Sequence, residues 1–166
     1  MKKFLVIAVL AVASLAAYAQ PRAIGANVGS SIAFSYQHGF GEANMLDVSV
    51  YTPLASGRGQ VWGLGAHITY DWIDPFGAAV PWNNKGEWHW YMGVGGAGGA
   101  YFASPGAGWV GVAGHIGIEY DFWFPFQLSL DWRPCIGVGI VGNGGGVGFN
   151  TGGLYDGITL GIRYKF

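Results

Sequence analysis

Large apolar side chains and charged side chains alternate along this chain with a period of two, and no other feature restricts its fold as strongly. In the final segment the even-numbered positions are apolar or aromatic, and the odd-numbered positions are small, polar or charged. The even positions hold Ile158, Leu160, Ile162, Tyr164 and Phe166, and the odd positions hold Thr159, Gly161, Arg163 and Lys165. A period of two indicates a β-strand whose two faces meet different surroundings.

Eight segments repeat this alternation, and we predict each of them to be a strand. Their ranges are 23–29, 31–38, 45–53, 60–72, 87–102, 109–122, 126–141 and 155–166. Of the ten charged residues in these ranges, only Asp156 has an even number. The other nine are Asp47, Asp71, Glu87, Glu119, Asp121, Asp131, Arg133, Arg163 and Lys165. Because successive side chains point to opposite faces of a sheet, one face carries the charges and the other carries the large apolar groups.

The composition indicates which face points outward. Charged residues make up 10% of the chain and hydrophobic residues 51%, whereas a soluble surface usually has about 25–35% charged residues. After residue 20 no apolar run approaches the ~20 residues of a membrane-spanning helix. Glycines gather on the charged face, as expected of a crowded interior. A chain of this kind can cross a bilayer as a closed sheet, because closure satisfies every backbone hydrogen bond.

The sequence therefore predicts an all-β fold, an antiparallel up-and-down transmembrane β-barrel of eight strands with the charged face inside. A soluble lipocalin-like barrel, which would place the charges outside, is the alternative. The strand count is open at the N-terminal end. The turn near Gly29 is very short, and a fusion of the first two strands would leave seven.

Residues 1–19 have the organisation of a secretory signal peptide. Two lysines precede an apolar stretch, and a small-x-small cleavage motif ends at Ala19. We therefore expect residues 20–166 to form the barrel domain. The leader holds two of the eight basic residues and none of the nine acidic ones. The remaining chain is mildly acidic, so its charge does not indicate a nucleic-acid partner.

Aromatic side chains on the even face collect near one end of the predicted strands. Rings with an apolar body and a polar edge suit the depth of lipid headgroups, where membrane barrels carry aromatic girdles. We predict a membrane girdle formed by Tyr36, Tyr70, Trp72, Trp88, Trp90, Tyr120, Phe122 and Phe126.

The last third of the chain holds three distinctive stretches. They read Ile-Glu-Tyr-Asp-Phe at 118–122, Gln-Leu-Ser-Leu-Asp at 127–131 and Gly-Ile-Arg-Tyr-Lys-Phe at 161–166. These stretches resemble the small eight-stranded outer-membrane β-barrels of Gram-negative bacteria, the OmpX/OmpA-like family. The resemblance implies a location in the cell outer membrane, in contact with its lipid. It also implies a C-terminal signal for the barrel-assembly machinery, formed by Ile162, Tyr164 and Phe166.

The interior of an eight-stranded barrel is only wide enough for side chains to fill it. We therefore predict that the charged face forms a packed network of ion pairs, since an unpaired charge in such a site is costly. We expect the last strand to bring its two cations beside Asp131 and Arg133. The predicted network consists of Glu119, Asp121, Asp131, Arg133, Arg163 and Lys165.

No motif indicates catalysis. Gly93 begins a G-x-G-x-x-G match, which carries no meaning without a following helix. His67, His89 and His115 are expected in the interior, but their spacing fits no metal site. Ser104 has no histidine nearby in sequence to activate it. We expect a structural or interaction-type monomer with no cofactor, no metal and no catalytic residue. A lipid-modifying hydrolase or acyltransferase of the same shape and a narrow channel are the alternatives.

Overall fold

The structure, a computed structural model, describes residues 20–53, 62–74, 85–102, 105–142, 146–150 and 157–166. Every regular element in them is a β-strand. The strands are β1 (Gln20–Gly29), β2 (Ser31–Gly39), β3 (Asn44–Pro53), β4 (Gly63–Ile73), β5 (Gly86–Tyr101), β6 (Ala107–Phe122), β7 (Phe126–Trp132), β8 (Cys135–Val141), β9 (Val147–Asn150) and β10 (Ile158–Lys165). None of these residues forms a helix of the length and apolarity that a membrane crossing requires.

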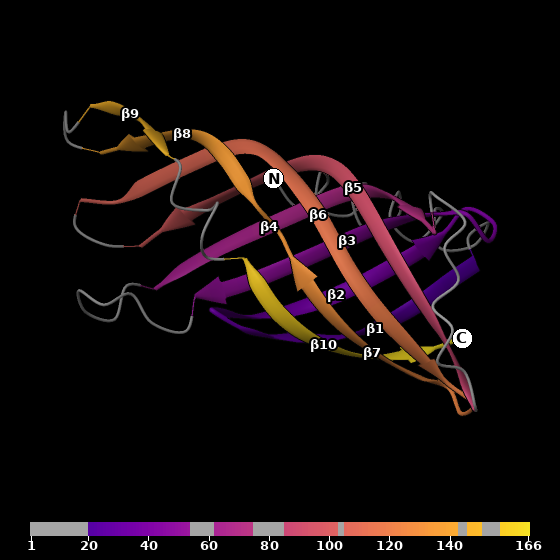
Figure 1. The fold of residues 1–166 in the computed structure, drawn as a ribbon. Helices are drawn as coiled ribbons and strands as arrows, with labels where there is room; N and C mark the ends of the chain where they lie inside the picture. The colour runs from indigo at the N-terminus through magenta and orange to yellow at the C-terminus, as the bar shows by residue number, and fades with distance from the viewer. Residues whose placement is uncertain (1–19, 54–61, 75–84, 103–104, 143–145, 151–156) are drawn as a thin grey trace, which may run out of the picture.

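The strands form one closed antiparallel barrel (Figure 1). From β1 to β6 each strand pairs with the next one along the chain, and β10 closes the barrel by pairing with β1. β7 and β8 both pair with β6 and together form the seventh strand. β9 pairs with β8 and β10 pairs with β7, so these two segments share the eighth position. The predicted all-β up-and-down barrel is confirmed. Its strand count is eight, because β1 and β2 pair directly across the short turn at Ser30.

The two ends of the barrel differ. β5 and β6 have 16 residues each and extend, together with β8 and β9, beyond the rest of the barrel (Figure 1). We call this the extended end. The opposite end, which we call the terminal end, holds the start of β1 and the end of β10, since Ala23 pairs with Lys165. The turns at 40–43 and 123–125 lie at the terminal end as well.

Pro134 separates β7 from β8. Proline lacks the amide proton that a strand uses in its ladder. Its carbonyl still accepts a hydrogen bond from the Gly114 amide at 2.8 Å, which keeps the chain beside β6. On the other side, the Arg133 amide donates to the Gly157 carbonyl at 3.1 Å. Beyond this bond β8 pairs with β9 in place of β10.

The two faces of the barrel wall carry opposite kinds of side chain. On the inside, Arg163 is 1% exposed and His115 is fully buried. On the outside, Val112 is 67% exposed and Leu160 is 59% exposed. Strand alternation therefore places the polar odd-numbered residues in the interior and the apolar even-numbered ones on the surface.

The register of the last strand differs from the expected one. Arg163 lies opposite Gln127, and Thr159 rather than either cation lies opposite Asp131. No tight turn ties β10 to β7, and the strands of a closed barrel are staggered by its shear. Counting residues along the sequence therefore predicts the wrong register between β7 and β10.

A β-bulge at Arg22 breaks the alternation in β1. The ladder with β2 skips one position between Pro21 and Ala23, so Arg22 is an extra residue in its strand. A bulge re-aims the side chains around it. Arg22 therefore turns inward, although its number is even, and its guanidinium contacts Glu119 in the interior.

Candidate functional site

The polar interior of the barrel is the candidate site, because the strands gather the buried charges there. Its largest fully buried side chains are Arg163, Tyr91, Met45, His115, Gln37, Gln127 and Glu119. Apolar packing inside is local, as in the small cluster of Met45, Ile73 and Tyr91. The chemistry of the interior is therefore that of hydrogen bonds and ion pairs.

The Arg163 guanidinium, on β10, is surrounded by acceptors from three other strands. Its Nε donates to Ser35 Oγ at 2.9 Å, and its Nη1 donates to Ser129 Oγ at 2.6 Å. Its Nη2 donates to Asn27 Oδ1 at 3.1 Å and to Asp131 Oδ2 at 3.3 Å. One side chain thus joins β1, β2, β7 and β10. The pairing with Asp131 brings together two residues of the predicted network, although they are not opposite in register.

Asp131, on β7, collects several donors at its two carboxylate oxygens. The Tyr91 hydroxyl donates to Oδ1, and His115 Nε2 lies 3.2 Å from the same atom. Ser129 Oγ donates to Oδ2 at 2.8 Å, beside the bond from Arg163. These bonds compensate for the loss of water around a carboxylate that is almost fully buried.

Both ring nitrogens of His115, on β6, face carboxylates. Nδ1 lies 2.9 Å from Asp71 Oδ2, and Nε2 lies 3.2 Å from Asp131 Oδ1. A carboxylate oxygen accepts hydrogen bonds and does not donate them, so both nitrogens must carry protons to satisfy both contacts. With both carboxyl groups ionised, this geometry requires the cationic form of His115, beside the arginines.

Asp47, on β3, pairs with two arginines of the predicted network. Arg133 Nη1 lies 3.1 Å from Asp47 Oδ1, and Arg163 Nη2 lies 3.8 Å from Asp47 Oδ2. Arg133 also donates to Ser49, and its Nη2 lies 4.0 Å from Asp131. The prediction gave Asp47 the correct face but left it out of the network. β3 is not a neighbour of β7 or β10, and only closure of the barrel brings these side chains together.

Glu119, on β6, pairs with a cation that sequence reasoning missed. Arg22 Nη1 donates to Glu119 Oε2 at 3.2 Å, and Nη2 donates to Oε1. Gln127 Nε2 also donates to Oε2, at 2.6 Å. The predicted network gave Glu119 other cations. Arg22 was missed because the predicted strand began at residue 23, and because the bulge reverses the parity on which the prediction relied.

Asp121 and Lys165, two further members of the predicted network, lie together at the terminal end. Lys165 Nζ donates to Asp121 Oδ2. Glu87 lies opposite Asp121 in register, but its side chain is 71% exposed. Glu87 is 3.6 Å from His89 Nε2, and His89 Nδ1 is 2.7 Å from Asp74. The Asp121–Lys165 pair therefore lies at the terminal end, apart from the Glu87, His89 and Asp74 group.

The charges in the described part of the deep interior balance. Three arginines and the His115 cation contact four carboxylates, and the pairs of Arg22 with Glu119, of His115 with Asp71 and of both Arg133 and Arg163 with Asp47 join strands that are not neighbours. The carboxylates are Asp47, Asp71, Glu119 and Asp131. Removing one member of such a pair leaves the other buried without compensation, at a cost of about 3–5 kcal/mol.

The outer surface at the terminal end carries aromatic rings in contact, which we call the aromatic belt. Ring contacts at centroid separations of 4.8–5.7 Å link Trp88, Tyr120, Phe122, Phe124, Phe126, Tyr164 and Phe166. A second run links Tyr36, His38, Phe40, Tyr70 and Trp72. Trp90 lies on the same strand face as Trp88, opposite Ile118. Ile162 is exposed on the face of β10 that carries Tyr164 and Phe166.

Of the two other histidines expected inside, His89 keeps 26% exposure of its side chain, and His67 is held by aromatic rings. It packs against Tyr51 at a centroid distance of 5.0 Å and against Trp109 at 6.4 Å. Across the described residues, no group of three or more His, Cys, Asp or Glu side chains is placed to hold a metal ion.

Some predictions concern residues that the structure does not describe. The signal peptide at 1–19, Ser104 and Asp156 lie outside the described ranges. Comparison of the chain with models of known protein families, with curated proteins and with solved structures finds no match.

Proposed function

We propose that this chain is an integral β-barrel of a bacterial outer membrane, with a structural or interaction role, a packed interior and no catalysis. The observation that carries the proposal is the inverted placement of side chains, with charges inside and large apolar groups outside. The outward groups include Val112, Ile116, Leu130, Leu160 and Ile162. In water this arrangement is doubly unfavourable, because it buries charges and exposes apolar surface. In a bilayer the same outer face meets hydrocarbon.

The strand lengths agree with a bilayer crossing. β1, β2, β3 and β4 contain 10, 9, 10 and 11 residues, and a tilted membrane strand needs about 9–11. The aromatic belt stands at one end of these strands, at the depth proposed for headgroups. We assign the terminal end to the periplasm, because both ends of the barrel chain lie there, and the extended end to the outside.

The packed interior supports a barrel that does not conduct ions. The Arg22–Glu119 pair joins β1 to β6, and the Arg163–Asp131 pair joins β10 to β7. Side chains fill the lumen of an eight-stranded barrel. A continuous water path would have to displace these ion pairs, each of which is hydrogen-bonded to further groups.

Gel mobility tests the membrane barrel. We expect the protein to need detergent or lipid to stay folded in solution, and to migrate differently before and after boiling, because a closed barrel resists dodecyl sulfate until it is heated. A protein that is folded and soluble without detergent, with identical mobility in both samples, would overturn the proposal.

Two further measurements test the role. Planar-bilayer recordings should show no unitary conductance. Steady conductance steps would contradict the packed interior and indicate a channel. Mass spectrometry of lipid A from a deletion strain should show an unchanged acyl pattern. If the pattern is altered, and if returning the intact gene to the strain restores it, the protein would have a lipid-modifying role and not a structural one.

A further inference from the structure

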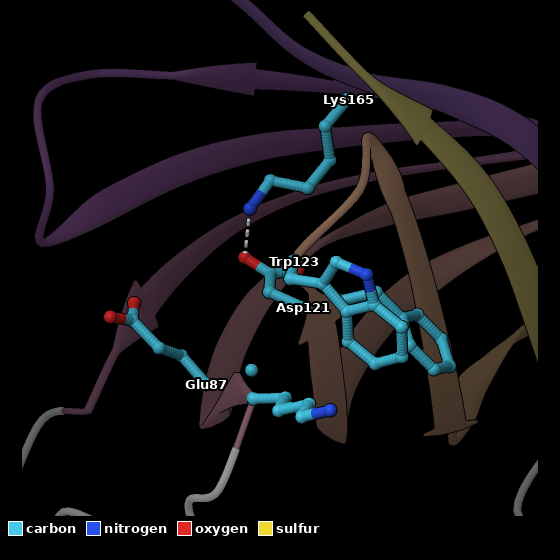
Figure 2. Close-up of a pocket in the computed structure, with 7 residues that line it drawn as sticks. Glu87, Asp121, Trp123 and Lys165 are labelled. Atoms are coloured by element: carbon cyan, nitrogen blue, oxygen red, sulfur yellow. Dashed lines mark hydrogen bonds and ion pairs between the residues drawn. The ribbon is translucent and has the colours of Figure 1, made fainter.

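A cavity of about 410 Å³ opens at the terminal end of the barrel (Figure 2). Its wall is formed by the start of β5, the end of β6 and the end of β10. The side chains that matter are Lys85, Glu87, Asp121, Phe122, Trp123 and Lys165. The volume falls in the range of small-molecule pockets, about 300–1,000 Å³. No arginine of the deep interior is among the residues that line the cavity.

Asp121 presents an unusual carboxylate to this cavity. It is 7% exposed, and its Oδ2 accepts a hydrogen bond from Lys165 Nζ. Its other oxygen, Oδ1, has no hydrogen-bond partner among the described residues. Buried carboxylate oxygens normally have a donor, because the lost hydration is otherwise uncompensated. Oδ1 is itself buried, so a ligand meets the carboxylate at Oδ2. A carboxylate oxygen has two lone pairs, which leaves Oδ2 room for a second donor beside Lys165. Asp121 can therefore accept a donor from a ligand.

The charges around the cavity are balanced and of both signs. Lys85 and Lys165 supply two ammonium groups, and Glu87 and Asp121 supply two carboxylates. Figure 2 shows Lys165 reaching down from β10 to Asp121, with Glu87 turned away from this pair. An ammonium group has three donors, and Lys165 gives one of them to Asp121. A zwitterionic ligand matches such a wall better than a simple cation or anion does.

The surroundings of the cavity indicate where that ligand resides. Trp123, on the cavity wall, is 68% exposed and contacts Phe122 and Phe124 of the aromatic belt. On the proposed function, this belt lies at the headgroup depth of the bilayer. A ligand that enters the cavity from the side would come from the lipid headgroup layer.

We infer that the cavity binds a phosphoethanolamine group, with the ligand ammonium donating to Asp121 and the ligand phosphate held by Lys85 and Lys165. This inference rests on the proposed membrane function for its lipid source. Phosphocholine carries the same charges, but its quaternary nitrogen has no N–H to donate. Comparison of the two headgroups therefore isolates the role of Asp121.

Native mass spectrometry of the purified protein in detergent micelles tests the inference. Phosphatidylethanolamine and phosphatidylcholine with identical acyl chains are added in turn, and the dissociation constant of each adduct is measured. We expect phosphatidylethanolamine to bind about tenfold more tightly, as one hydrogen bond to a charged acceptor allows. Asp121→Asn should reduce this preference, because its uncharged amide oxygen is a weaker acceptor, whereas Lys85→Met should weaken the binding of both lipids equally. Glu42→Gln, at an exposed turn of the same end, should change neither.

A lipid series guards against misfolding of Asp121→Asn. In the unaltered protein, phosphatidylethanolamine carrying one or two N-methyl groups should still bind, and the third methyl group should cause the loss of affinity. Equal binding of all four lipids, or an undiminished preference in a folded Asp121→Asn protein, would overturn the inference.

Free O-phosphoethanolamine distinguishes the two sources of the group. We expect it to displace the phosphatidylethanolamine adduct, while free phosphocholine does not. Binding of O-phosphoethanolamine without any lipid adduct would assign the site to a soluble ligand of the same chemistry, and binding of neither would overturn the site. A barrel that inserts into bilayers but does not distinguish the two lipids overturns the cavity assignment alone. A protein that never inserts overturns the proposed function instead.

Discussion

The Arg22 guanidinium holds both carboxylate oxygens of Glu119 across the interior of the barrel, although the two residues are 97 positions apart in sequence. β1 and β6, which carry them, are separated in the barrel by β10 and β7. Two parallel bonds from one guanidinium form the strongest common geometry of an ion pair. This pair therefore braces the barrel between walls that share no backbone hydrogen bonds.

Loss of this pair should weaken the barrel. Arg22→Met is expected to lower the free energy of unfolding by about 3 kcal/mol, the low end for a buried pair, because Arg22 itself keeps 16% exposure. Urea unfolding in lipid vesicles, followed by tryptophan fluorescence, measures the change. The double variant Arg22→Met/Glu119→Gln should recover most of the loss, since it leaves no unpaired charge. An equal loss in the single and double variants would contradict the role of the pair.

The His115 ring should carry a proton on each nitrogen in the folded barrel, because Asp71 and Asp131 accept at its two ends. Nuclear magnetic resonance of protein labelled with ¹⁵N-histidine measures this state, and the His115→Gln variant assigns the signal. We expect two similar ring ¹⁵N shifts, typical of imidazolium. Two widely separated shifts, which indicate one bare nitrogen, would contradict the imidazolium and show that the ring does not donate to one of the two carboxyl groups.

The seam between β1 and β10 depends on a close approach of backbones at Gly25. A Cβ at this position would overlap the Ile162 carbonyl oxygen. Gly25→Ala is therefore expected to lower the unfolding free energy by about 1–3 kcal/mol through overpacking. Gly148→Ala is the matched control, because a Cβ there meets nothing within 4 Å. Equal urea midpoints for the two variants would contradict the tight seam.

An arginine on the outer face distinguishes a membrane from water. Leu160 is more than half exposed in the middle of β10. In a bilayer, Leu160→Arg is expected to cost about 2–4 kcal/mol, whereas an exposed site of a soluble protein would change by less than about 0.5 kcal/mol. The unfolding free energy in lipid vesicles gives the answer, and Glu42→Arg at an exposed turn serves as control. A near-zero effect of Leu160→Arg would remove a main support of the membrane assignment.

The last residue should matter for assembly more than for stability. Phe166 is 70% exposed beyond the end of β10, where its ring contacts Tyr164. If it belongs to the assembly signal, Phe166→Ser should strongly reduce the amount of folded barrel in the outer membrane of cells. The same variant should refold in vesicles with nearly unchanged stability. Normal amounts of folded barrel in cells would contradict a role for Phe166 in assembly.

Much of the fold could be predicted because strand alternation is local. The strand predicted at 31–38 is β2 (Ser31–Gly39), and the segment predicted at 126–141 contains β7 and β8. The break between these two could not be placed by alternation, although Pro134 marks it, because the alternation resumes on the same face after the proline. Within the predicted network, the structure pairs Lys165 with Asp121 and Arg163 with Asp131, but the prediction named the six residues without specifying these pairs.

The sequence by itself determined which segments alternate, their two faces and the side of the wall on which most charges lie, because each of these follows from neighbours two positions apart. Only the tertiary structure decided that β1 and β2 are separate strands, that Arg22 meets Glu119 and that Arg133 meets Asp47. The two ion pairs cross the lumen, and their geometry depends on the shear of the closed barrel and on the β-bulge at Arg22. Both are properties of the whole sheet, which no single strand encodes.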